Sequence, residues 1–154
     1  YIDVVKNVGS DVPFFINKQP ATISGIGENV VNLNDTRPIK VIIAVPKKGL
    51  STKEIFEKYD EMKPKDTEKY SWNDISLFND LWNTSVEIYP ELNTIKQNLE
   101  DRYNKNFFMS GSGSALFSLF EENEEIEEID SEEFNLKYFS ITKKIDCSFS
   151  QNDD

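Results

Sequence analysis

Two apolar runs separated by five small residues restrict the possible fold more than any other stretch of this chain. The runs Asn106–Met109 and Ala115–Phe120 flank the sequence Ser-Gly-Ser-Gly-Ser at positions 110–114. Short apolar runs bounded by turn residues are typical of buried strands. A linker rarely interrupts two adjacent strands, so a tight turn is expected, or a loop whose exposed backbone N–H groups hold an anion. The loop residues alone leave these alternatives open.

Other apolar patterns predict a sheet around this pair of strands. The β-branched run Ile39–Val45 is typical of a central strand, and it stops at Pro46. The segment 134–145 predicts a final strand, and the segments 21–24 and 30–33 predict two short ones.

Three helices are predicted between these strands. A capping box, Ser51 to Glu54, opens the first, whose inner face would carry Ile55, Tyr59 and Met62. The second would start at Ser71, and the third would start near Pro90. Apolar residues spaced three and four apart support both helices. They are Ile75, Phe78, Leu81 and Trp82 in the second helix, and Leu92, Ile95 and Leu99 in the third. Loosely alternating strands and helices favour an α+β sandwich with its helices on one sheet face.

Length and charge restrict the function. The 154 residues suit one core, and no apolar run approaches the roughly 18 residues of a membrane-spanning helix. The net charge of −11 argues against nucleic-acid binding. Most of it comes from nine acidic residues in the run 121–133, which is expected to be solvated; a cation site or a basic partner is the alternative. Because the chain has no histidine, its chemistry must use carboxylates, hydroxyls, lysine or backbone amides.

Two further residues have both a structural and a functional interpretation. Asp11, in the sequence Gly-Ser-Asp-Val-Pro, could cap a helix, or it could orient a hydroxyl and accept its proton. Phe56 points about 100° away from the face of Ile55. It could fill a side pocket of the core, or it could stack on a planar ligand.

The order of these blocks resembles the GHMP kinases. The blocks are GSDVPFF, GIGE, an Ile/Val strand ending in proline, GLSTKEIF, NDL and MSGSGSALFSLF, and they span roughly residues 6–120. Within the superfamily, STKEIF and NDL point to the transferase of the non-mevalonate isoprenoid pathway, whose substrate is a cytidine diphosphate sugar alcohol. Another member, of the homoserine or mevalonate type, and a non-catalytic ferredoxin-like binding domain remain alternatives.

The resemblance implies a site and its partners. The γ-phosphoryl of ATP would move to the 2-hydroxyl of the substrate with Mg²⁺ assisting, without a nucleic acid or membrane partner. Asp11 matches the catalytic aspartate, and Gly111, Ser112 and Gly113 match the loop of the phosphate site. Phe56 matches the aromatic residue that stacks on cytosine, and Thr52 lies on the same substrate loop. No metal ligand is assigned.

The resemblance also implies a domain organisation. Residues 1–35 would end the N-terminal kinase domain and include Asp11, residues 36–146 would form the ferredoxin-like C-terminal domain, and 147–154 would be a tail. The run 121–133 would be an acidic insertion. The glycine-serine ATP loop and its partner lysine are absent from the 154 residues, so these residues alone are expected to be inactive. The implied location is bacterial cytoplasm, or the stroma of a plastid or apicoplast.

Overall fold

A computed structural model describes residues 21–25, 29–32, 38–64, 67, 69–73 and 75–143. The chain divides into two compact units, one formed by residues 1–38 and 145–154, the other by residues 39–144. In the first unit, β1 (Ala21–Ser24) pairs antiparallel with β2 (Asn29–Asn32), and Gly25 takes a φ of 72° where the chain leaves β1. The two short predicted strands are therefore confirmed.

The second unit is built on a four-stranded antiparallel sheet. Its strands are β3 (Ile39–Pro46), β6 (Phe108–Met109), β7 (Leu116–Glu121) and β8 (Leu136–Lys143), in the order β6-β7-β3-β8. The predicted central strand is confirmed, because β3 pairs with β7 on one side and with β8 on the other. The strands on either side of the small-residue loop pair with each other through Phe108 and Phe117.

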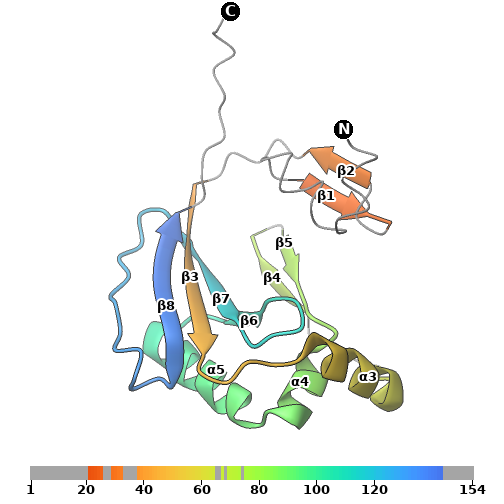
Figure 1. The fold of residues 1–154 in the computed structure, drawn as a ribbon. Coiled ribbons are helices and arrows are strands. Elements are labelled where there is room, and N and C mark those ends of the chain that lie inside the picture. The colour runs from red at the N-terminus through yellow and green to blue at the C-terminus, as the bar shows by residue number, and fades with distance from the viewer. Residues whose placement is uncertain are drawn as a thin grey trace, which may run out of the picture. The chain divides into compact units, whose positions relative to one another are not determined.

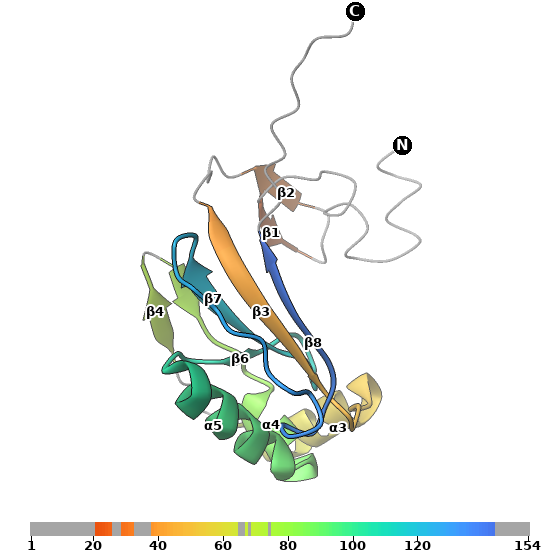
Figure 2. The ribbon, with the colours of Figure 1, turned by 90° about the vertical axis from the view of Figure 1, so that its left-hand side faces the viewer.

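Three helices belong to the same unit: α3 (Thr52–Met62), α4 (Trp82–Ile88) and α5 (Glu91–Tyr103). Figures 1 and 2 show α4 and α5 along one side of the sheet. Two of these helices, α3 and α5, were predicted. The α+β class is confirmed, with antiparallel sheets and helices against the larger of them. No described helix is both long and apolar enough to cross a membrane.

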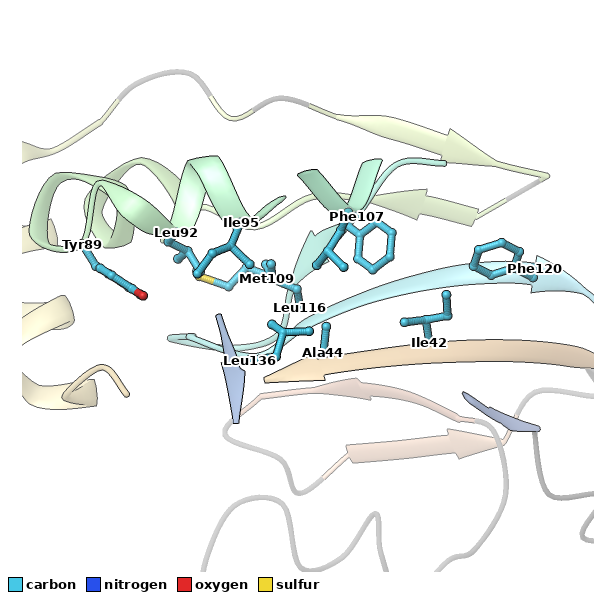
Figure 3. Close-up of a cluster of buried hydrophobic side chains, with 11 residues drawn as sticks. Ile42, Ala44, Tyr89, Leu92, Ile95, Phe107, Met109, Leu116, Phe120 and Leu136 are labelled. Atoms are coloured by element: carbon cyan, nitrogen blue, oxygen red, sulfur yellow. The ribbon is translucent and has the colours of Figure 1, made fainter. Parts of the chain in front are cut away.

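The core lies between α5 and the sheet. Leu92, Ile95 and Leu99 are the buried residues of α5, as their spacing predicted. Figure 3 shows this helix face above side chains from the strands. The sheet and the segments beside it contribute Ile42, Ala44, Phe107, Met109, Leu116, Phe120 and Leu136. Burying aliphatic and aromatic side chains of this size contributes about 1.5–3 kcal/mol each, before the entropy cost of ordering them.

The prediction of a helix that starts at Ser71 is wrong. The chain instead forms a hairpin of β4 (Tyr70–Trp72) and β5 (Ile75–Leu77), and α4 starts only at Trp82. Trp72 pairs with Ile75, so two residues connect the strands, and the first of them, Asn73, has a φ of 51°. Asparagine tolerates this left-handed conformation, and two-residue hairpins require it. The turn overrides the helical spacing of the apolar residues.

The inner face of α3 differs in part from the prediction. Ile55 is fully buried and Tyr59 is half-buried, but Met62 is 38% exposed. Met62 is the last residue of α3, and Lys63 follows it in the left-handed conformation with a φ of 45°. The helix therefore ends before this side chain can pack.

The acidic run connects β7 to β8 without regular secondary structure. Most of its carboxylates are exposed, in agreement with the prediction of a solvated run. Two of its apolar residues, Ile126 and Ile129, pack against the core. Ion pairs hold it as well: Glu124 pairs with Lys105, Glu127 with Arg102 and Glu132 with Lys47.

Candidate functional site

The loop at 110–114 is a closed turn. The backbone N–H of Ser110 donates to the carbonyl of Ala115 (2.9 Å), and that of Gly113 donates to the carbonyl of Ser110 (3.0 Å). Gly111 and Gly113 have φ values of 55° and 88°, a region that suits glycine. These contacts rule out the linker interpretation. The turn is fixed by backbone conformation and needs no large side chain.

Gly113 is also required by the space around it. A Cβ at this position would lie 2.8 Å from the Sδ of Met109 and 3.0 Å from a Cδ of Leu50. A Cβ at Gly111 would meet nothing within 4 Å. The two glycines of the loop therefore have different roles, since only Gly113 lies closely against its neighbours.

Side chains from outside the loop hold it in place. The Nδ2 of Asn79 donates to the carbonyls of Met109 (2.8 Å) and Gly111 (2.9 Å). The buried Ser114 donates from its Oγ to the carbonyl of Lys48 (2.7 Å), and the Oγ of Ser85 donates to the carbonyl of Ser112 (3.5 Å). The loop is thus attached to the segment after β3, to the segment before α4, and to α4 itself.

Helix α3 begins beside this loop. Its N-cap, Ser51, has extended backbone angles, and its Oγ accepts from the N–H of Glu54 (3.4 Å), as the capping box predicted. Thr52, the first helical residue, places its Oγ1 2.9 Å from the Oγ of Ser112. The free N–H groups and the dipole of a helix start favour an anion. Hydroxyl groups and a helix start therefore come together at the loop.

Phe56 lies one turn further along α3 than Thr52. Residues four positions apart share one face of a helix, so both belong to the face that meets the loop. Phe56 is 51% exposed, whereas its neighbour Ile55 is fully buried. Phe56 therefore does not fill a side pocket of the core. Its ring is accessible to a planar ligand.

The nearby ionisable groups include lysines that flank the start of α3. Lys48 lies over the ring of Tyr89, with its Nζ 4.5 Å from the ring centroid. Burial, and secondarily the negative charge of Glu91, raise the pKa of Tyr89, so its phenol stays neutral at physiological pH. Lys53 pairs with Glu57 on the exposed side of α3 (3.7 Å). The start of α3 thus carries both basic and acidic side chains, Lys53 with Glu54 and Glu57, beside the hydroxyl groups of the site.

Of the residues that the sequence nominated, the structure places Thr52 in contact with Ser112, which lies in the loop between Gly111 and Gly113, and it places Phe56 one turn further along α3 than Thr52. The remaining nominated residue, Asp11, lies outside the described residues. In the described part of the chain, no group of three His, Cys, Asp or Glu side chains could hold a metal ion.

Sequence reasoning assigned no role to Asn79 and Ser85, which hold the loop. The signal for Asn79 was present, because it begins the NDL block, which carried part of the resemblance. Ser85 has no distinguishing sequence context.

Comparison with known proteins gives consistent matches. The family model described as GHMP kinases C terminal matches residues 69–132. The 4-diphosphocytidyl-2-C-methyl-D-erythritol kinase of Protochlamydia amoebophila is 35% identical over 114 residues, covering 73% of this chain and 40% of the relative. The enzyme of the same name from Clostridium acetobutylicum is 30% identical over 157 residues, covering 93% and 52%. The chain thus spans about half the length of these relatives.

A solved structure supports the fold. A 4-(cytidine 5'-diphospho)-2C-methyl-D-erythritol kinase superposes with a TM-score of 0.60 at 23% identity, covering 77% of this chain and 47% of that one. The resemblance that the sequence blocks carried is therefore confirmed. The chain belongs to the GHMP kinase superfamily, and residues 69–132 match its C-terminal domain.

Proposed function

We propose that this chain is the C-terminal part of an ATP-dependent kinase that phosphorylates the 2-hydroxyl of 4-diphosphocytidyl-2-C-methyl-D-erythritol in isoprenoid biosynthesis. The loop 110–114 would lie on the phosphate side of its site, and α3 would hold the cytidine end of the substrate. Asp11 and the first 35 residues would belong to the N-terminal kinase domain, and the C-terminal domain would extend over 36–146.

The observation that carries the proposal is the meeting of three sequence blocks that are far apart in the chain. Thr52 of STKEIF contacts Ser112 of MSGSGS at 2.9 Å. Asn79 of NDL donates to the carbonyls on either side of Ser110, those of Met109 and Gly111. Phe56 offers an exposed ring on the same helix face as Thr52.

In the proposed reaction, the phosphoryl group passes directly from ATP to the substrate, without a covalent enzyme intermediate. The substrate hydroxyl oxygen forms a bond to the γ-phosphorus as the bond from that phosphorus to the β,γ-bridging oxygen breaks, and ADP leaves. Asp11 accepts the hydroxyl proton. Phosphoryl transfer requires mainly positioning and charge stabilisation, so one carboxylate together with backbone and hydroxyl donors suits it.

The family also implies Mg²⁺. The described residues offer no acidic cluster that fits the ion, so we assign it no ligand in this part of the chain.

The experiment is an ADP-release assay on the complete kinase that carries this segment, with ATP and 4-diphosphocytidyl-2-C-methyl-D-erythritol. Wild type is expected to turn over, and Asp11→Asn is expected to lose about 100-fold or more in kcat, the scale of a general base. The isolated 154 residues are expected to be inactive.

Two results would count against the proposal. A complete protein that phosphorylates homoserine or mevalonate, but not the cytidine-bearing substrate, would favour another GHMP kinase. Unchanged turnover of Asp11→Asn would remove the proposed role of that carboxylate, and absence of turnover by the wild-type protein on all of these substrates would favour a domain without catalysis.

A further inference from the structure

The side-chain amide of Asn79 makes three hydrogen bonds that connect the loop 110–114 to the start of α4. Its Nδ2 donates both of its protons, to the carbonyls of Met109 (2.8 Å) and Gly111 (2.9 Å). Its Oδ1 accepts from the N–H of Leu81 (2.9 Å). A single amide group therefore connects the start of α4 to the loop, across about 30 residues of sequence.

The two carbonyls that Asn79 binds lie at the point where the chain leaves the sheet. Met109 is the last residue of β6, and Gly111 is the first glycine of the loop, with a φ of 55°. Holding both carbonyls on one amide fixes the direction of Ser110 between them. It also turns these carbonyl oxygens toward Asn79.

We propose that Asn79 is a positioning residue, which sets the conformation of the loop 110–114 and thereby the aim of its backbone N–H groups during phosphoryl transfer. The role of Asn79 in the loop conformation is inferred from its three hydrogen bonds alone. Its effect on turnover rests on the proposed function. A positioning role fits the geometry because the side-chain amide of Asn79 donates both of its protons to the loop and accepts from the N–H of Leu81.

The chemistry of the amide makes Asn79→Asp the most informative variant. A carboxylate retains an oxygen that can accept from Leu81, so the start of α4 keeps its contact. It loses both donated protons and turns a negative charge toward two carbonyl oxygens. Asn79→Ala removes all three contacts. Asn98→Ala is the matched control, because Asn98 lies exposed on α5 and away from the loop.

The first test uses the 154-residue chain itself. Backbone amide hydrogen exchange of Ser110 and Gly113, whose N–H groups are hydrogen-bonded within the loop, is measured by NMR. The exchange rate is expected to rise about tenfold or more in Asn79→Asp and Asn79→Ala, the scale of one or two lost hydrogen bonds, and to stay at the wild-type rate in Asn98→Ala. Protection of the β3–β8 amides shows that the fold is retained. Wild-type exchange in the loop of a folded Asn79→Asp overturns the proposal.

The second test uses the complete kinase. Asn79→Asp is expected to lower kcat about tenfold or more and to raise the KM for ATP, while the KM for the cytidine-bearing substrate changes less than twofold. Rates are normalised to the folded fraction, because loss of folded enzyme alone would lower kcat and leave both KM values unchanged. An unchanged normalised kcat and KM for ATP, despite a loosened loop, overturns the role in turnover.

The two tests separate this inference from the proposed function. If wild type phosphorylates no such substrate, the proposed function fails, and with it the role of Asn79 in turnover. The hydrogen-exchange result still decides whether Asn79 sets the loop conformation.

Discussion

At the scale of single residues, Ile55 and Phe56 show how α3 divides its apolar side chains between the core and the candidate site. Ile55 is fully buried, and Phe56 is 51% exposed. The helical spacing in the sequence separated the two residues correctly. It left open whether Phe56 packs in a pocket, because spacing gives a direction and not the neighbours in that direction.

This division predicts that two adjacent substitutions have very different effects on stability. Ile55→Ala should lower the free energy of unfolding by about 2–5 kcal/mol, because it leaves a cavity in the core. Phe56→Ala should change it by no more than about 0.5 kcal/mol, the usual range for surface substitutions. Urea denaturation of the chain, followed by circular dichroism, measures both. A large loss in Phe56→Ala would show that its ring is structural.

The loop glycines give a second prediction at this scale. Gly113→Ala should destabilise the chain by about 1–3 kcal/mol, because the new Cβ meets Met109 and the φ of 88° is strained for alanine. Gly111→Ala should cost less, since only its φ is unfavourable. Gly49→Ala is the control, having open space and no positive φ. Equal unfolding midpoints for the variants at positions 113 and 49 would contradict this account.

The residues that hold the loop by long-range hydrogen bonds were the hardest to predict from the sequence. Thr52, Gly111 and Ser112 could be nominated because they stand in recognisable blocks. The hydrogen bonds of Asn79 could not, since they depend on the β4–β5 hairpin bringing residue 79 next to residues that lie some 30 positions later. A short local pattern carries no information about such a partner.

At the scale of elements, sequence patterns succeeded where local preference and packing agree. The strand β3 and the helix α5 follow directly from a β-branched run and from a three-and-four spacing. The helix prediction failed for the segment 70–77, because the spacing of its apolar residues suits a helix while Asn73 suits a two-residue turn. The turn prevails, and Tyr70 then packs edge-to-face on Phe108 at 5.5 Å. A tertiary contact of this kind cannot be seen in the sequence.

The connection between β7 and β8 gives a pH prediction. The hydrogen bond from Lys105, and then that from the N–H of Glu121, hold the pKa of Glu124 below its usual value of 4.5. A lowered pKa in the folded state stabilises the fold above the unfolded-state pKa, and this contribution is lost as the pH falls through the folded-state pKa. The wild-type chain should therefore lose stability as the pH falls below about 4.5.

The variant Glu124→Gln isolates this contribution. It should be less stable than wild type at neutral pH, and the difference should shrink in acid. Urea unfolding between pH 3 and pH 7 measures this, with the exposed Glu125→Gln as the matched control. A difference between wild type and Glu124→Gln that does not depend on pH would contradict the role of the Lys105–Glu124 pair.

At the scale of the whole molecule, the described part of unit 39–144 contains the candidate site. It offers a closed loop, a helix start and an accessible aromatic ring. The matched relatives are about twice as long as this chain. The fold class could be reached from sequence, because the blocks that carry it lie within one unit. The domain bounds at 35 and 146 and the roles of all six nominated residues remain predictions.

The central claim is that α3 presents Phe56 to the cytidine end of the substrate while the loop 110–114 serves the phosphoryl end. The most direct measurement compares kcat/KM of the complete kinase for 4-diphosphocytidyl-2-C-methyl-D-erythritol and for a cytidine-free analogue, 2-C-methyl-D-erythritol, in wild type and Phe56→Ala. Stacking contributes about 1–3 kcal/mol per base, so Phe56→Ala should lower kcat/KM for the cytidine-bearing substrate about 5- to 150-fold and leave the analogue unchanged. An equal loss for both substrates, or no loss for either, would contradict the account.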